Sequence, residues 1–207
     1  MAKKNIGGKK EDNSLFKVIS IILIIFIAFF LIGYFLKDSG NNIVYNDINF
    51  VRSGDVWVGE FKYFGKYYKV PFYYSPEEVG AVIVNTDATD PILQIDRSKG
   101  WFIVSVDPDI PAFMGVAGTQ IARVTGTRYG LLNIPTKAAF YSTPDFETEE
   151  PIIDCSQAQP NLVVLHLQIG EENSIIREGY CITLTAVDKE GAYMAADRFV
   201  YELLKIM

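Results

Sequence analysis

Few residues of this chain combine the type and the spacing that chemistry requires. His166 is the only histidine, which excludes zinc sites built from several histidines and means that any Ser-His-Asp arrangement must use this residue. It lies within the apolar segment 162–169, which is typical of a β-strand. A histidine in such a strand is ordinarily half-buried and hydrogen-bonded. It could act as a catalytic base if a serine or a carboxylate met it across the sheet.

Asp107 and Asp109 are the most promising pair of carboxylates. They follow an apolar strand and precede a predicted helix, which is where α/β sheets place their ligand crevices. The positive end of a helix stabilises carboxylate anions and lowers their pKa. The pair therefore suits a helix cap or a divalent-cation site better than a general acid. The candidate catalytic residues are thus Asp107, Asp109 and His166.

A second group of oxygen ligands lies in the loop 85–90. Asp87 and Asp90 have the spacing of a loose Ca²⁺ loop, but the segment lacks the glycine and the terminal glutamate of an EF-hand. The candidate metal ligands are Asp87, Asp90, Asp107 and Asp109, and Ca²⁺ is the only cofactor that the sequence suggests. No phosphate-binding glycine loop and no kinase, hydrolase, haem or nicotinamide motif occurs.

Aromatic side chains gather in the segment 45–74. Their period of two on either side of Gly65 and Lys66 predicts a β-hairpin with a tight turn. Cross-strand packing ordinarily accounts for so many aromatic residues. The tyrosines cannot all point inward, however, and stacking against a peptide or a glycan is the alternative. The candidate binding residues are Tyr67, Tyr68, Tyr73 and Tyr74.

The elements that would position these residues indicate a mixed α/β (α+β) domain. One predicted helix ends near Thr125, a second begins after Asp188, and a short one follows Ser75. Strand, helix and strand over 101–141 form a βαβ unit, which implies parallel pairing. We expect one mixed sheet of about five to seven strands, two main helices and an N-terminal aromatic hairpin. The predicted strands beyond that hairpin lie at 101–106, 133–141, 162–169 and, as a second hairpin, 174–185.

The most apolar segment runs from Val18 to Leu36, nineteen residues without a charge. At ~1.5 Å per residue a helix of this length covers about 28 Å, the thickness of a bilayer core. Five lysines precede the segment and Lys37 alone follows it before Arg52, so the N-terminus is predicted to be cytoplasmic. The predicted organisation is a cytoplasmic basic tail at 1–16, a transmembrane helix at 17–37, a linker at 38–44 and an extracytoplasmic domain at 45–207.

The apolar segment has three alternative interpretations. A cleaved signal peptide usually has an apolar core of ~7–15 residues and small residues at its cleavage site, and the segment has neither. A pilin leader places its glycine directly against the apolar helix, whereas Gly7 and Gly8 lie several residues before it. A core helix of a water-soluble fold is seldom apolar on every side.

Charge and cysteine content agree with an outer domain. Residues 1–37 carry a net charge of +4 and residues 38–207 a net charge of −10. So acidic a domain lacks the basic face that nucleic-acid binding requires, which excludes nucleic acid as a partner. Cys155 and Cys181 both lie in the acidic part, and an even pair in an oxidising compartment favours a disulfide over a reactive thiol.

Several motifs support a resemblance. They are FIVSVDPDI at 102–110, IPTKAAF at 134–140, the paired cysteines, and the C-terminal segment 180–207 with its Ala-Ala-Asp-Arg sequence. In these features the chain resembles a group of small, uncharacterised single-pass membrane proteins of archaea. The resemblance implies an N-terminal anchor, an archaeal cell envelope and a bridge between Cys155 and Cys181. It implies no activity.

The sequence therefore predicts a membrane-anchored binding or assembly module of the cell envelope. It would contact lipid through residues 18–36 and an envelope protein or glycan through its outer domain, with no catalysis evident. One alternative is a carboxylate-dependent enzyme or divalent-cation-binding protein that uses Asp107 and Asp109. The other is an accessory subunit of a larger membrane complex, although the apolar segment lacks the small-residue seam of packed membrane helices.

Overall fold

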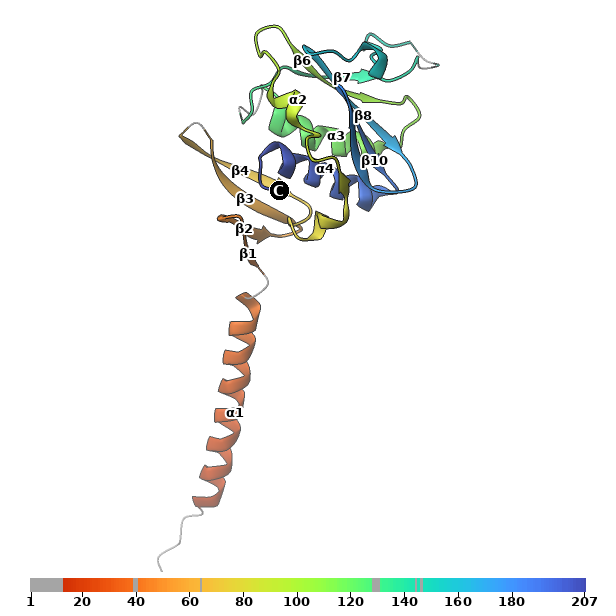
Figure 1. Ribbon diagram of the computed structural model, residues 1–207. Helices are drawn as coiled ribbons and strands as arrows, with labels where there is room; N and C mark the ends of the chain where they lie inside the picture. Colours follow the sequence, from red (N-terminus) through yellow and green to blue (C-terminus); the bar gives the residue numbers. More distant parts are fainter. Residues whose placement is uncertain (1–12, 39–40, 64, 128–130, 144, 146) are drawn as a thin grey trace, which may run out of the picture. The chain divides into compact units, whose positions relative to one another are not determined.

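The computed structural model describes residues 13–38, 41–63, 65–127, 131–143, 145 and 147–207 (Figure 1). The chain divides into two compact units, residues 1–42 and 43–207. Most of the predicted basic tail, residues 1–12, lies outside the described residues.

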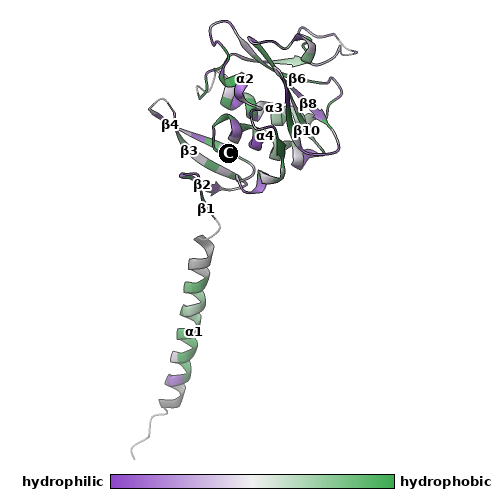
Figure 2. Ribbon diagram, in the orientation of Figure 1, coloured by the Kyte–Doolittle hydropathy of each residue, from purple (hydrophilic) through white to green (hydrophobic). Residues whose placement is uncertain are grey.

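The first unit contains helix α1 (Asn13–Asp38), which includes the whole apolar segment 18–36. Figure 2 shows hydrophobic residues along the middle of this helix. Residues 17–32, whose side chains are described, are all exposed. Among the described residues, no helix is both long enough and apolar enough to qualify as a membrane span.

The second unit has a four-stranded sheet at its start. The predicted aromatic hairpin is confirmed as β3 (Val56–Tyr63) and β4 (Lys66–Phe72), which pair antiparallel. Two further strands extend it to the order β1-β2-β3-β4, so the sheet is larger than the sequence predicted. These are β1 (Asn42–Tyr45), which begins inside the predicted linker, and β2 (Ile48–Ser53).

The remaining strands form a six-stranded mixed sheet with the order β5-β9-β10-β8-β6-β7. Strands β6, β7, β8 and β10 pair parallel, β9 runs antiparallel to β10, and β5 pairs parallel with β9. The bounds of the strands are β5 (Ile83–Val84), β6 (Trp101–Val106), β7 (Thr136–Phe140), β8 (Leu162–Ile169), β9 (Ser174–Glu178) and β10 (Cys181–Ala186).

The predicted βαβ unit is present, because α3 (Ala112–Thr125) joins the parallel neighbours β6 and β7. Its predicted apolar stripe, at 114, 117, 121 and 124, is buried. Strand β7 starts later than predicted. Asn133 has a positive φ of 53°, and the amides of Leu132 and Ile134 donate to carbonyls at the end of α3, which keeps this segment out of the ladder.

The segment after β4 contains less helix than the sequence predicted. Ser75 and Glu78 form a capping box, in which the Ser75 amide donates to Glu78 Oε2 at 2.7 Å and the Glu78 amide donates to Ser75 Oγ at 3.4 Å. Only one 3₁₀ turn follows, η1 (Glu78–Ala81), and then the β-branched residues of β5. The loop predicted at 85–90 leads into a further short helix, α2 (Asp90–Leu93).

Helix α4 (Lys189–Leu203) lies with α3 between the two sheets (Figure 1). Its start is capped as predicted, because Asp188 Oδ1 accepts from the Gly191 amide at 2.8 Å. On one side Tyr201 stacks on Phe72 of β4, with ring centroids 4.3 Å apart, and packs edge-on against Phe50 of β2. On the other side α4 contacts β10. The prediction of a single sheet was therefore wrong: two apolar sheet faces cover opposite sides of the helices.

The far face of the six-stranded sheet is held to the segment that follows β7. The predicted disulfide between Cys155 and Cys181 is confirmed, with the two Cα atoms 5.3 Å apart. Cys155 opens the short turn η2 (Cys155–Gln157), and Cys181 is the first residue of β10. The bridge thus fastens this segment to a central strand.

Packing of the four-stranded sheet on α4 can be tested in strand β2. Phe50 is fully buried against Tyr201, whereas the next residue, Val51, is 42% exposed on the other face. We expect Phe50→Ala to lower the free energy of unfolding of the full-length protein by about 3–5 kcal/mol, measured by chemical denaturation in micelles. The control Val51→Ala should cost less than about 1 kcal/mol. Equal losses for the two variants would contradict the packing.

Candidate functional site

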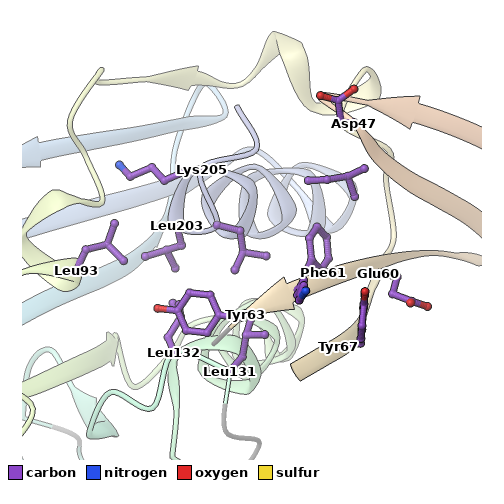
Figure 3. Close-up of a pocket in the computed structure, with 13 residues that line it drawn as sticks. Asp47, Glu60, Phe61, Tyr63, Tyr67, Leu93, Leu131, Leu132, Leu203 and Lys205 are labelled. Carbon is purple, nitrogen blue, oxygen red and sulfur yellow. The ribbon is translucent and has the colours of Figure 1, made fainter. Parts of the chain in front are cut away.

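An open groove of about 510 Å³ lies where the four-stranded sheet meets the end of α4 (Figure 3). Its floor is apolar: Leu131, Leu132 and Leu203 are almost fully buried there. Figure 3 shows Leu93 and Tyr63 close to these leucines. The remaining lining residues are Asp47, Ile48, Glu60, Phe61, Lys62, Tyr67, Leu204 and Lys205.

Local sequence creates the walls of this groove. The turn between β1 and β2 has positive φ angles at Asn46 and Asp47, residue types that tolerate this conformation. Asn46 Nδ2 donates to the carbonyl of Ile206 at 2.7 Å, which ties the turn to the chain just after α4. Lys205, also with a positive φ, turns that chain and places Nζ 2.9 Å from Asp90 Oδ1.

The rim of the groove is polar and carries both signs of charge. Asp47 and Glu60 supply carboxylates, and Lys62 and Lys205 supply ammonium groups. Tyr67 is 67% exposed and lies 5.8 Å below the Lys62 ammonium group, measured to the ring centroid. A leucine-rich floor within a charged rim suits the binding of an apolar group presented by a partner. The groove is not lined by Asp107, Asp109 or His166.

The four predicted binding tyrosines do not form one surface. Tyr67 and Tyr68 are neighbours in β4 and therefore point to opposite faces of the sheet. Tyr73 stacks on Tyr193 of α4 with ring centroids 4.6 Å apart. Tyr74 is half-buried, and its main chain is bound to α4. Of the four, only Tyr67 lines the groove.

Asp197 of α4 is the most deeply buried acidic residue of the described chain, with no exposed surface. Its Oδ2 accepts from the Tyr74 amide at 2.8 Å, and Oδ1 is hydrogen-bonded to Gln120 of α3. Tyr201 Oη donates to the Tyr74 carbonyl at 2.7 Å. Burial raises the pKa of Asp197 well above its usual range, because the hydrogen bonds that favour the anion only partly offset desolvation.

This cluster was not predicted as a site, although its aspartate belongs to the Ala-Ala-Asp-Arg sequence. The signal in the sequence was a lone carboxylate among small residues of an otherwise apolar helix face. Burial also raises the pKa of Tyr74 and of Tyr201, and the neighbouring carboxylates add to both shifts. The arrangement fastens the end of β4 to both helices and leaves Asp197 no open space for a substrate.

The structure brings together two of the three candidate catalytic residues. His166 Nε2 lies 3.3 Å from Asp107 Oδ2, so a carboxylate does meet the strand histidine across the sheet. Tyr141, which the sequence did not single out, stacks on the imidazole with ring centroids 3.6 Å apart. Asp109 is exposed, and the structure does not place it beside the histidine.

Ser105 lies beside the histidine, but its hydroxyl group is already hydrogen-bonded elsewhere. It is the direct neighbour of His166 in the parallel register of β6 and β8, yet it is fully buried. Its hydroxyl donates to the carbonyl of Ile153 at 2.6 Å. The side chain of His166 is only 8% exposed, and its imidazole stacks on Tyr141. These contacts suit attachment of Tyr141 and Ile153 to the sheet better than proton transfer to a substrate.

The predicted metal ligands of the loop 85–90 are each engaged by a cationic side chain. Arg177 Nη1 lies 2.7 Å from Asp87 Oδ2, and Lys205 pairs with Asp90. Asn85 Oδ1 accepts from the Arg177 amide at 2.6 Å. Over the ranges that the structure describes, no three histidine, cysteine, aspartate or glutamate side chains are grouped to hold a metal ion. The loop is thus organised by the protein's own cations.

Comparisons with models of protein families, with curated proteins and with solved structures find no match for this chain.

The His166 contact predicts a specific dependence of stability on pH. Burial lowers the pKa of His166, and the nearby Asp107 carboxylate only partly offsets this. The folded state therefore favours neutral imidazole. The contribution of His166 to the free energy of unfolding is complete above pH ~6.5 and is lost as the pH falls below that value. Between pH 7 and pH 5, the wild type should lose more stability than His166→Gln in denaturant titrations. Parallel curves for the two proteins would contradict this account.

Proposed function

We propose that this chain is a membrane-anchored module that binds a partner polypeptide outside the lipid, with the groove at the end of α4 as its binding site. The observation that carries the proposal is the groove itself, which has a floor of leucine side chains and a rim that bears both positive and negative charges. A volume of about 510 Å³ falls within the range of ligand pockets, ~300–1,000 Å³. A partner that inserts an apolar side chain would cover the half-buried Ile48, Tyr63 and Leu93 above this floor.

The anchor is supported by the sequence and by the exposure of α1. Nineteen uncharged residues lie within one helix, and every described side chain from 17 to 32 is exposed. Apolar surface costs ~25 cal/mol per Å² in water, and lipid removes that cost. The lysines before the segment favour a cytoplasmic N-terminus.

An extracytoplasmic location of residues 43–207 is supported by the disulfide and by the negative net charge. A structural disulfide persists in an oxidising environment, such as the outer side of a cell membrane. The acidic outer part is repelled by anionic lipid and remains soluble beside it. The resemblance to archaeal single-pass proteins favours an archaeal cell envelope.

A carboxylate-dependent enzyme or cation-binding protein is a second candidate, favoured by the 3.3 Å contact between His166 and Asp107. The near-complete burial of the imidazole and the hydrogen bond that occupies Ser105 weigh against it. An accessory subunit of a larger membrane complex is a special case of the leading proposal. In that case the groove partner would be another subunit.

The anchor and the groove can be tested in intact cells. Carbonate washing should leave the full-length protein in the membrane, and external protease should degrade residues 43–207. Tyr67→benzoylphenylalanine places a photoreactive group at the groove rim, and Tyr180→benzoylphenylalanine places one on an exposed turn elsewhere. We expect a discrete protein adduct from position 67 alone, reduced about tenfold by Leu93→Arg, which introduces a charge into the apolar lining.

The matched control for Leu93→Arg is Ile169→Arg, which alters an exposed residue at the end of β8. It should leave the adduct from position 67 unchanged. Release by carbonate or protection from external protease would contradict the anchor or its orientation. Adducts to lipid only, or the same adducts from positions 67 and 180, would contradict the groove as a polypeptide site.

A further inference from the structure

Strand β4 is the longest free sheet edge that the structure describes. It closes the order β1-β2-β3-β4 and pairs only with β3. The other edge strands, β1, β5 and β7, are shorter, and β7 is partly covered by a bridge between Phe140 and Ile152. An uncovered strand edge presents main-chain donors and acceptors in a row and can pair with another chain.

The position of Pro71 shows which groups face outward. Pro71 opposes Val58 and lacks an N–H, so this pair suits the non-hydrogen-bonded positions of the ladder. Tyr63 and Lys66 flank the two-residue turn and therefore form a hydrogen-bonded pair, which is consistent with a non-hydrogen-bonded pair at Val58 and Pro71. Since the alternation has a period of two, the N–H and C=O groups of Tyr67 and Lys69 point away from β3 at the free edge.

A groove runs beside this edge, between β4 and α3. Two adjoining hollows of about 160 and 90 Å³ share Pro71 and Arg123 as lining residues. Val116 of α3, 41% exposed, offers an apolar contact in the smaller hollow. Gln120 also lines it, and its buried Oε1 has no hydrogen-bond partner among the described residues.

The charge of this groove comes from Arg123. Arg123 lines both hollows and is exposed, in a chain whose residues 38–207 carry a net charge of −10. Lys69 borders the larger hollow, but its side chain lies on the outer face of the sheet, like that of Tyr67, where it makes a long contact of 3.8 Å with Glu60. A carboxylate is the complementary ligand group, because opposite charges across paired strands are favourable.

We propose that the free edge of β4 accepts an extended acidic peptide segment of a partner protein as a fifth strand, with one face against α3 and a carboxylate beside Arg123. The added strand would exchange main-chain hydrogen bonds with Tyr67 and Lys69 and would end near Pro71. Its inward side chains would pack on Val116. This site goes beyond the groove at α4, with which it shares only Tyr67 among the residues named here, and it does not depend on the anchor.

The lysines of β4 disfavour pairing of its free edge with a second copy of the same strand. A second copy of β4 would bring its own lysines, Lys66 and Lys69, against the same residues, and like charges directly opposite each other are destabilising. Lysine and proline on an edge also discourage indiscriminate pairing. An acidic strand avoids both obstacles.

The experiment uses the full-length protein in lipid nanodiscs and a fluorescent heptapeptide that alternates valine and threonine around a central glutamate. Fluorescence anisotropy should show saturable binding at concentrations below ~1 mM. Arg123→Glu should weaken binding about tenfold, as should replacement of the peptide glutamate by lysine, since a charge-assisted contact is lost. The matched control Arg97→Glu, at an exposed arginine of the loop before β6, should bind like the wild type.

A peptide N-methylated at alternate residues distinguishes strand addition from electrostatic attraction alone. It keeps the glutamate charge, but it lacks the main-chain N–H donors on the edge that would pair with β4. It should not bind, and hydrogen exchange should show protection of residues 66–72 by the unmodified peptide alone. Absence of saturable binding, equal binding of the N-methylated peptide, or protection at β7 instead would overturn the proposal. Protection of β4 that grows with protein concentration in the absence of peptide would assign the edge to a second copy and would also overturn it.

Discussion

The structure of the second unit depends on one helix that is buried on both sides. Helix α4 packs on the aromatic face of the four-stranded sheet through Tyr201, and it also contacts β10 of the six-stranded sheet. Its buried side chains include three alanines, Ala192, Ala195 and Ala196, which allow neighbouring elements to approach closely. Asp197 links α4 to two neighbouring elements. Its carboxyl group accepts hydrogen bonds from the main-chain amide of Tyr74, just after β4, and from the side-chain amide of Gln120 in α3. A buried acid that binds main chain is costly to remove, because its loss leaves other polar groups unpaired.

This arrangement determines which surfaces remain for function. The inner faces of both sheets are covered by α3 and α4, and the far face of the six-stranded sheet is partly covered by a segment held through the disulfide and the contacts of His166. The open features include the groove at the end of α4 and the edge of β4 beside α3. Both lie on the four-stranded sheet, which follows α1 directly in the chain.

The sequence predicted those elements whose pattern is local. The buried stripe of α3, the strand at 162–169 and the cap at Asp188 each follow from spacing within a few residues, and the structure contains all three. What it could not predict is the partition into two sheets, because strand pairing between distant segments leaves no local pattern. The same limit applies to the site. Asp107 and His166 were both singled out, but the stacking of Tyr141 and the hydrogen bond of Ser105 depend on long-range folding. The groove leucines come from three separate segments, and each alone resembles ordinary core.

The central claim is that α4 and Asp197 make the two sheets one cooperative unit, and the two tryptophans of the chain allow a direct test. Trp57 lies in β3 of the four-stranded sheet, and Trp101 lies in β6 of the six-stranded sheet. Trp101→Phe leaves a probe of the first sheet alone, and Trp57→Phe leaves a probe of the second. Urea titration of each variant in micelles, followed by tryptophan fluorescence and by circular dichroism, should give a single transition in which the two signals coincide. Loss of the Trp57 signal at a urea concentration that leaves the Trp101 signal intact would contradict the account.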